Sequence, residues 1–257
     1  MSYKEESPVT PETVAVTENL QRQSIEAYLT IAHELKTGMS ESDIAKNLVG
    51  ELAHRGINDF WYNIPILVLI GSDRFQQMAD PDYAVKSPSE DVRLKPGDPF
   101  FIDVHPRDKS TRWGNFASTG IYQPGDEQLD ELLFLQRMQG IQEQIVGSMT
   151  GIDIGAKVAQ GFNTLFENES ISLLDVRGNF GHTMGYGQKS DYERSFLDES
   201  NNQQIGGKIW GIEPGGVKTL GNKLLVARME DCVHIPRVGE PRVLGRQNLP
   251  PVAFPNR

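Results

Sequence analysis

Five short stretches of the chain carry carboxylate, amide or imidazole side chains that could together hold a divalent metal ion. The stretches are Phe101–His105, Trp113–Phe116, Gly181–Gly185, Ile212–Gly215 and Met229–Asp231. Their ligand-type residues are Asp103, Asn115, His182, Glu213 and Glu230, which lie 12, 67, 31 and 17 positions apart. Carboxylate oxygens with one imidazole nitrogen suit divalent cations. Any one of these residues alone is more often a turn, cap or structural residue, so the hypothesis depends on the whole series.

Four further residues stand near members of this series. His105 follows Asp103 by two positions and shares its face if the strand is regular. It is either a ligand or general base at the pocket, or a strand-end histidine bonded to a loop. Arg228 lies two positions before the last acid and could anchor a substrate carboxylate or form a surface salt bridge. Cys232 and His234 alternate after that acid, and we interpret them as packing or rim residues.

Hydrophobic spacing predicts the elements that must position these side chains. A helix is expected from about Glu12 to Gly38, a residue type that commonly ends helices. Ser40 and Asp43 form a capping-box pattern for a second helix that ends at Gly56. Further predicted elements are strands at 64–70, 99–105 and 119–122, helices at 126–150 and 151–166, and a hairpin within 220–235 that turns at Gly221-Asn222.

Length and composition bound the architecture. The chain has 257 residues, of which 38% are hydrophobic and 23% charged, and this is ordinary for a globular protein. We predict a loose arm at 1–11, one catalytic domain at 12–235, and an extended proline-rich tail at 236–257. No internal repeat or low-complexity segment is visible.

Charge and cysteine content exclude several classes of protein. The net charge of −10 argues against nucleic acid as the main partner, because a phosphate backbone requires a basic face. Neither a signal peptide nor an apolar stretch of membrane-spanning length is recognisable. Cys232 is the only cysteine, so an intramolecular disulfide and multi-cysteine metal sites are excluded. These features predict a cytoplasmic protein.

The ordered series resembles the metal ligands Asp, Asp, His, Glu and Glu of the methionine aminopeptidase, prolidase and creatinase family. Leu94–Asp98 resembles the turn before the family's first Asp, and Gly38–Ala45 resembles the start of its second helix. The resemblance covers about 12–235 and implies the α/β (α+β) pita-bread fold, with a curved, mostly antiparallel sheet and helices on one face. The extra N-terminal domain of prolidases is lacking, so the chain resembles the short form.

The sequence departs from the family's pattern at three places. Asn115 stands where the family has its second Asp, and a neutral amide bridges two ions poorly. Asp108 is nearby but lacks the matching local setting. The family's peptidases have a histidine before the first Asp and another after the ligand histidine, whereas 70–100 and 185–191 contain none. Peptidase activity is therefore in doubt.

We expect a metal-dependent enzyme acting on a small amino-acid-like or amide substrate, by hydrolytic C–N cleavage. The alternatives are a mononuclear-metal enzyme of the non-haem iron oxygenase or lyase type, and a non-catalytic binding member of the fold. Iron or manganese is favoured and cobalt or zinc is compatible, with one or two ions per chain and one tightly held ion expected. The assigned catalytic residues are His105 and Glu213.

Other expectations concern substrate and assembly. We assign Arg228 to substrate binding, and we expect a small-molecule substrate, no nucleic acid, no membrane, and a homodimer as the candidate assembly. The candidates for lining the cavity, which the sequence does not place, are Arg112, Trp113, Tyr186 and Trp210.

Overall fold

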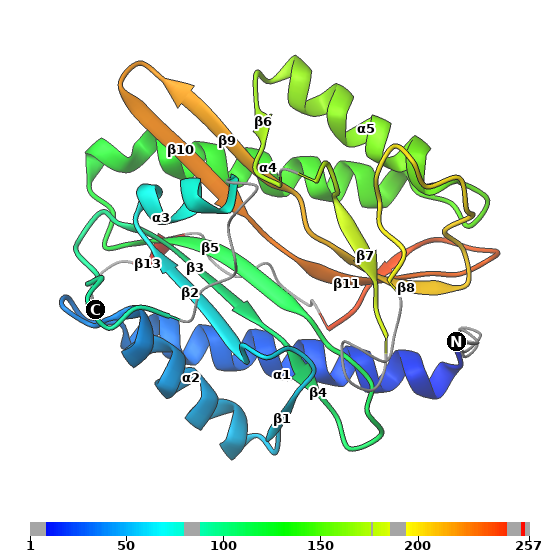
Figure 1. The fold of residues 1–257 in the computed structure, drawn as a ribbon, viewed down its shortest axis with the longest axis horizontal. Coiled ribbons are helices and arrows are strands. Elements are labelled where there is room, and N and C mark those ends of the chain that lie inside the picture. The colour runs from blue at the N-terminus through cyan, green and yellow to red at the C-terminus, as the bar shows by residue number, and fades with distance from the viewer. Residues whose placement is uncertain (1–8, 80–87, 176, 186–193, 246–252, 255–257) are drawn as a thin grey trace.

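Two pairs of long helices pack on separate groups of strands, one pair from each half of the chain (Figure 1). The computed structural model describes residues 9–79, 88–175, 177–185, 194–245 and 253–254. The helices are α1 (Pro11–Glu34), α2 (Glu41–His54), α3 (Ser72–Gln76), α4 (Leu129–Ser148) and α5 (Gly155–Asn168), with 3-10 turns at Gln77–Ala79 and Asp126–Gln128.

The described strands pair antiparallel, with one exception. The first half contributes a sheet of order β13-β5-β3-β2, built from β2 (Ile66–Ile70), β3 (Pro99–Val104), β5 (Phe116–Tyr122) and β13 (Ala253–Phe254). Only the β13–β5 pair is parallel. The second half contributes the order β12-β11-β8-β7, built from β7 (Gly181–Thr183), β8 (Lys208–Ile212), β11 (Asp231–Ile235) and β12 (Arg242–Val243).

Two smaller sheets complete the described strands. One has the order β10-β9-β6, from β6 (Ser172–Leu173), β9 (Gly215–Leu220) and β10 (Lys223–Arg228), and the other pairs β1 (Asp59–Phe60) with β4 (Pro106–Arg107). The two halves meet where Glu230, just before β11, pairs with Ala117 of β5. Their backbones exchange two hydrogen bonds, with N···O distances of 2.8 and 3.1 Å.

Each half has its own apolar core. In the first half, the buried faces of α1 and α2 pack on β2, β3 and β5 through residues such as Tyr28, Leu48 and Ile102. In the second half, α4 and α5 pack on the remaining strands through residues such as Met138 and Phe162. A helix with one apolar stripe has to bury it against a sheet or helix, and this requirement places the helices outside the strands.

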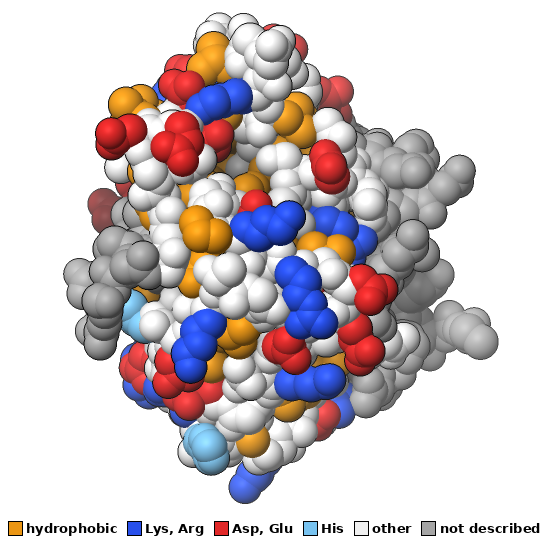
Figure 2. All heavy atoms as spheres, turned by 90° about the vertical axis from the view of Figure 1, so that its left-hand side faces the viewer, with side chains coloured by type: hydrophobic (Ala, Val, Ile, Leu, Met, Phe, Trp, Pro, Cys, Tyr) orange, Lys and Arg blue, Asp and Glu red, His pale blue; other side chains and the backbone are white. Residues whose placement is uncertain are grey.

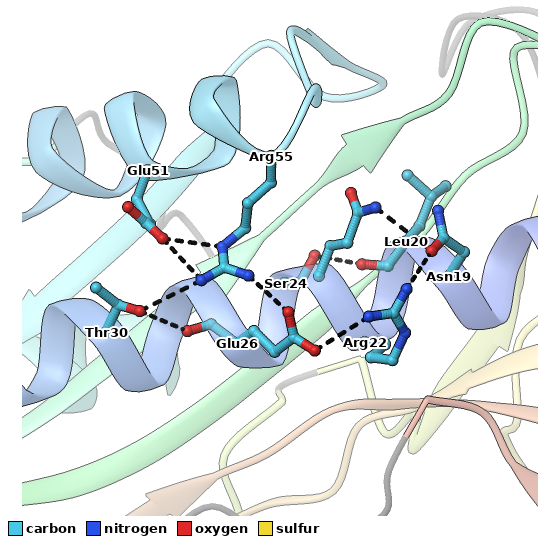
Figure 3. Close-up of polar contacts among 9 residues, drawn as sticks. Asn19, Leu20, Arg22, Ser24, Glu26, Thr30, Glu51 and Arg55 are labelled. Carbon is cyan, nitrogen blue, oxygen red and sulfur yellow. Dashed lines mark hydrogen bonds and ion pairs between the residues drawn. The ribbon is translucent and has the colours of Figure 1, made fainter.

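The capping box predicted for the second helix is confirmed. The Ser40 hydroxyl accepts from the Asp43 backbone N–H at 3.0 Å, and the Asp43 carboxylate accepts from the Ser40 N–H at 2.9 Å. At the other end of this helix, the C-cap residue Arg55 bonds Glu26 and Thr30 of α1 and Glu51 of α2 (Figure 3). These partly exposed contacts hold α1 against α2.

Glu41, the first residue of α2, is fully buried and ties four segments together. Its carboxylate accepts two hydrogen bonds from Arg74 of α3, at 3.0 and 2.9 Å. It also accepts from the backbone N–H groups of Ile70, at the end of β2, and Ser89. Glu41 thereby holds the end of β2, α3 and Ser89 together, and β2 pairs with β3, which carries Asp103.

Most predicted elements are present with shifted bounds. The first helix begins at Pro11, one residue earlier than expected, because Thr10 caps it. The expected hairpin is corrected: its turn lies at Gly221-Asn222, but its strands are β9 and β10. The stretch from Asp231 leaves the hairpin and pairs with β8. Within the predicted tail, β12 and β13 pair with neighbouring strands and Leu244 is buried.

The charged surface is mixed on the face seen in Figure 2. Lysine and arginine side chains lie beside aspartate and glutamate there, with small hydrophobic spots between them. Among the described residues, no helix combines the length and apolar character needed to cross a membrane.

Candidate metal centre

The five ligand-type residues come from both halves of the chain and are all buried. Asp103 lies near the end of β3, and Asn115 immediately precedes β5. His182 lies in β7, Glu213 immediately follows β8, and Glu230 immediately precedes β11. The ends of strands from two sheets therefore meet at one position, the junction formed by Ala117 and Glu230.

His182, Glu213 and Glu230 form the closest group. One ligand atom from each lies within 4.8 Å of the corresponding atoms of the other two, and all three residues are buried. A histidine and two carboxylates at such distances could hold one divalent ion. Asp103 is not part of this closest group, although its charge acts on both Glu230 and His182.

The geometry of His182 prepares one ring nitrogen for a ligand. Its Nδ1 lies 3.0 Å from the Thr183 carbonyl oxygen, which only accepts, so Nδ1 carries the hydrogen. Burial lowers the pKa of His182 to about 4. The ring is therefore neutral at pH 7, and Nε2 keeps a lone pair that can bind a metal ion. The Nε2 atom lies 3.7 Å from Glu230 Oε1. This arrangement, with a carbonyl orienting the histidine from behind, is common among metal-binding histidines.

Asn115 and Glu230 form a direct pair. Asn115 Nδ2 donates to Glu230 Oε1 at 2.6 Å, while the buried Asn115 Oδ1 has no hydrogen-bond partner in the described part of the chain. Burial, together with the charges of Glu213 and Asp103, raises the pKa of Glu230 well above its ordinary value. A bound cation would reduce the electrostatic repulsion among these carboxylates. The amide oxygen of Asn115 could serve as a further ligand to it.

Arg228 supplies a positive charge inside the site. Its guanidinium donates to Glu213 Oε2 at 2.5 Å and stacks over Phe101 at 6.0 Å. Burial by itself would lower the pKa of Arg228, but the charges of Glu213 and Asp103 outweigh this effect and raise it. Arg228 is thus a mostly buried partner of Glu213, with 15% of its side chain exposed, and not a surface salt bridge. Its assignment to substrate binding stays a prediction.

Asp103 and His105 lie side by side, as their shared strand face predicted. His105 Nε2 lies 3.2 Å from Asp103 Oδ1, and His105 Nδ1 lies 3.0 Å from the Ile64 carbonyl oxygen. His105 is therefore bonded to a loop carbonyl and also faces the Asp103 carboxylate. Both interpretations of His105, as a strand-end histidine bonded to a loop and as a ligand or general base of the pocket, are consistent with these contacts. The pair can exchange a proton between Nε2 and the carboxylate, or share a cation.

These residues fit a divalent ion. The closest group offers a neutral imidazole nitrogen and carboxylates. Two further buried oxygens lie beside it: Asn115 Oδ1, which has no hydrogen-bond partner among the described residues, and Asp103 Oδ1, which faces His105 Nε2 at 3.2 Å without a well-formed hydrogen bond. Buried polar atoms without partners are uncommon and call for an explanation such as an ion. The donor set of nitrogen and oxygen atoms suits manganese, iron, cobalt or zinc.

Gly211 provides the space that Glu230 occupies. A Cβ atom at position 211 of β8 would overlap Glu230 Oε1, the end of a flexible side chain. We expect Gly211→Ala to preserve the fold but displace this carboxylate. Metal affinity should fall by roughly 10–100-fold, the loss typical when a supporting residue is altered. Isothermal titration with Mn²⁺ measures this, and Gly140→Ala in α4, where nothing lies within 4 Å, is the control. Equal affinities of the two variants would contradict the prediction.

An aromatic wall that the sequence did not reveal borders the site. The Trp61 ring stacks on Trp113 at 4.3 Å and meets the rings of His105 and His182 at 5.3 and 6.0 Å. Tyr62 lies 5.0 Å from His105. Trp113 therefore lies beside the site, as one of the expected lining residues. Trp61 Nε1 donates to the Gly114 carbonyl at 2.9 Å, and because the two residues are 53 positions apart no sequence pattern predicts this contact.

Other sequence candidates lie elsewhere. Trp210 is buried in the core of the second half, which corrects its assignment to the cavity. Asp108 bonds Ser110 and the Arg112 backbone within a turn, so it does not replace the missing acid. Tyr186 lies outside the described residues. Arg112 lies half-buried in the same turn as Asp108, so its place in the cavity lining stays a prediction. Cys232 is buried and His234 is half-buried.

One comparison with known proteins identifies a family. The sequence matches metallopeptidase family M24 over residues 17–237. No curated protein matches it. The X-Pro aminopeptidase from Thermotoga maritima has a similar structure, with a TM-score of 0.73 and 18% identity over 96% of this chain.

Two further solved structures show the same fold. The prolidase from Pyrococcus horikoshii has a TM-score of 0.74 with 16% identity over 95% of this chain, and the methionine aminopeptidase from Thermotoga maritima has 0.73 with 14% over 94%. This chain spans 64% of the X-Pro aminopeptidase and 65% of the prolidase, but 100% of the methionine aminopeptidase.

Proposed function

We propose, from the premise that the chain belongs to metallopeptidase family M24, that it cleaves a C–N bond in a small amino-acid-derived molecule by metal-dependent hydrolysis. The family consists of metal-dependent hydrolases, and the pita-bread fold expected from the sequence is confirmed by the similar structures. The observation that carries the proposal is the buried group of His182, Glu213 and Glu230.

The residues of the site have separate tasks in such a reaction. A bound divalent ion would supply a Lewis acid and lower the pKa of a bound water. His182 presents its neutral Nε2, while Glu213 and Glu230 present carboxylates. Arg228 fixes the orientation of Glu213 through the 2.5 Å contact. His105, with Asp103 at 3.2 Å, accepts a proton from the attacking water and returns it to the leaving nitrogen.

The charges of the site support one tightly held ion. Asp103, Glu213 and Glu230 are the acids, whereas Asn115 is neutral where the family pattern has an acid. Arg228, which pairs with Glu213 inside the site, offsets one of these three negative charges. A single divalent cation balances the remainder, and a second would be uncompensated. Iron or manganese is favoured, in keeping with the carboxylate-rich donor set.

Metal content and hydrolysis test this proposal together. We expect elemental analysis to find one tightly bound divalent ion per chain, and Asn115→Asp to bind a second by restoring the missing charge. Purified protein supplied with manganese or iron should hydrolyse small N-acylated amino acids or amides, and chelation should abolish the reaction. Ordinary peptides should be cleaved far more slowly, since losing one electrostatic donor typically costs about 10²–10³ in rate.

Other outcomes would replace the proposal with one of its alternatives. Metal-dependent consumption of oxygen, or elimination without water, would indicate a mononuclear oxygenase-like or lyase enzyme. A metal-loaded protein that binds amides but never turns them over would be a binding member of the fold. Two tightly bound ions in the unaltered chain would contradict the charge argument. A small-molecule substrate, a cytoplasmic location and a homodimer remain predictions.

A further inference from the structure

Thr119 of β5 is buried where the two halves of the chain meet. Its hydroxyl donates to the carbonyl oxygen of Arg228 at 2.7 Å and accepts from the backbone N–H of the same residue at 2.9 Å. Thr119 is only 3% exposed, so water does not compete for these two hydrogen bonds. A hydroxyl can donate and accept through one atom, and here it satisfies both polar backbone groups of a residue 109 positions away.

These hydrogen bonds extend the junction formed by Ala117 and Glu230. Thr119 follows Ala117 by two positions and Arg228 precedes Glu230 by two, so they are the next facing residues of the same antiparallel register. At this pair the Thr119 hydroxyl takes the place of a backbone partner. The segment from Arg228 to Glu230 is therefore attached to β5 at both of its ends.

The attachment determines the position from which the Arg228 side chain reaches the site. Arg228 is the last residue of β10, and its guanidinium lies 6.0 Å from the centre of the Phe101 ring. Phe101 faces Thr119 directly in the pairing of β3 with β5. From this position the guanidinium donates to Glu213 Oε2 at 2.5 Å. A chain of contacts thus runs from the Thr119 hydroxyl through Arg228 to a residue of the closest ligand group.

We propose that Thr119 is a positioning residue of the candidate metal centre, which through Arg228 holds the Glu213 carboxylate in the orientation that binds the ion. The inference rests on the proposed function for the presence of a divalent ion, but it does not require turnover. The hydroxyl is engaged by the Arg228 backbone, so it acts on the site through that residue. Without the hydroxyl, the buried N–H and C=O of Arg228 would lose their partner, and the segment could shift.

Thr119→Val and Thr119→Ser test the role of the hydroxyl. Valine keeps the branched shape without the hydroxyl, whereas serine keeps the hydroxyl. We expect isothermal titration of the full chain with Mn²⁺ to show roughly tenfold weaker binding by Thr119→Val, the lower end of the loss typical when a residue supporting a ligand is altered. Thr119→Ser should restore most of the affinity. The visible absorption spectrum of the Co²⁺-loaded protein depends on ligand geometry, and it should change in the valine variant only.

A milder variant keeps the test informative if the valine variant does not fold. Thr119→Cys replaces the hydroxyl with a thiol, which is a weak donor and a weak acceptor. Its Mn²⁺ affinity should lie between those expected for the serine and valine variants. An affinity equal to that of the unaltered protein would contradict the inference.

A double-mutant cycle tests whether Thr119 acts through Arg228. In an Arg228→Met background, Thr119→Val should change the Mn²⁺ affinity by no more than about twofold, because the guanidinium that it positions is gone. The same tenfold loss in both backgrounds would show that Thr119 acts on the centre by another route, and the inference would be wrong.

Thr30→Val is the matched control. The Thr30 hydroxyl also donates to a backbone carbonyl, that of Glu26, and accepts from Arg55, but it does so where α1 meets α2 (Figure 3). This variant should keep the Mn²⁺ affinity of the unaltered protein. If Thr119→Val lowers the midpoint of urea unfolding but keeps the Mn²⁺ affinity and the Co²⁺ spectrum, Thr119 has a structural role alone and the inference fails.

The same measurements separate this inference from the proposed function. An unaltered chain that binds no divalent ion would overturn both. Mn²⁺ binding that weakens in Thr119→Val and recovers in Thr119→Ser, in a protein that hydrolyses no amide, would support the positioning role and overturn the proposed function alone.

Discussion

Replacing His182 with alanine should lower the affinity for divalent metal by more than the roughly 10–100-fold lost when only an outer-shell partner is removed. His182 supplies the nitrogen of the closest ligand group, and its neutral state at pH 7 follows from a pKa of about 4. Without it, Glu213 and Glu230 remain as neighbouring carboxylates, one of them already engaged by Arg228. Equilibrium dialysis against Mn²⁺ or Zn²⁺ measures the loss, and any metal-dependent turnover should disappear with it.

His234→Ala provides the matched control for this change. His234 lies in β11, is half-buried, and is outside the ligand group. It should retain metal content and turnover. Circular dichroism and urea unfolding of both variants separate metal loss from unfolding. A folded His182→Ala protein with undiminished metal content would show that the centre lies elsewhere.

Glu41→Ala should lower the free energy of unfolding by about 3–5 kcal/mol, as expected when one partner of a buried ion pair is removed. The alanine would leave the mostly buried Arg74 guanidinium without its carboxylate. It would also strand the backbone N–H groups of Ile70 and Ser89. Urea denaturation monitored by circular dichroism gives the change. Since Ile70 pairs with Phe100 of β3, local loosening would spread toward Asp103.

Glu26→Ala is the contrasting variant for Glu41. Glu26 also bonds two arginines, Arg55 and Arg22 (Figure 3). Its side chain, however, is 42% exposed. Exposed pairs contribute only about 0–1 kcal/mol. If the two variants lose similar stability, burial is not what makes the Glu41 cluster important, and the expectation fails.

Local signals made much of the fold predictable. The capping box at Ser40 and Asp43 depends on residues three positions apart, so the sequence shows it directly. The hairpin turn at Gly221-Asn222 was found for the same reason. Its strands were misplaced because partner choice is not local: Asp231 onward pairs with β8, and no feature of that stretch announces the change of sheet.

The site was predictable where residue type and order carried the information. Asp103, Asn115, His182, Glu213 and Glu230 were selected from the ordered series, and the structure places them at one junction, although their role as ligands stays a prediction. Trp61 and Tyr62 were missed. They approach the centre through contacts between distant segments, and isolated aromatic or basic residues carry no spacing signal. The pairing of Arg228 with Glu213 could not be predicted for the same reason.

Glu230 connects the candidate metal centre to the backbone junction between the two halves of the chain. The same residue exchanges backbone hydrogen bonds with β5 and bonds Asn115 through its carboxylate. Any cation held there would tie together segments more than a hundred residues apart, as a disulfide does in secreted proteins. With only one cysteine, the chain has no such covalent crosslink within it. A cation bound at this centre would then act as a reversible crosslink. Its binding would raise the free energy of unfolding of the whole domain.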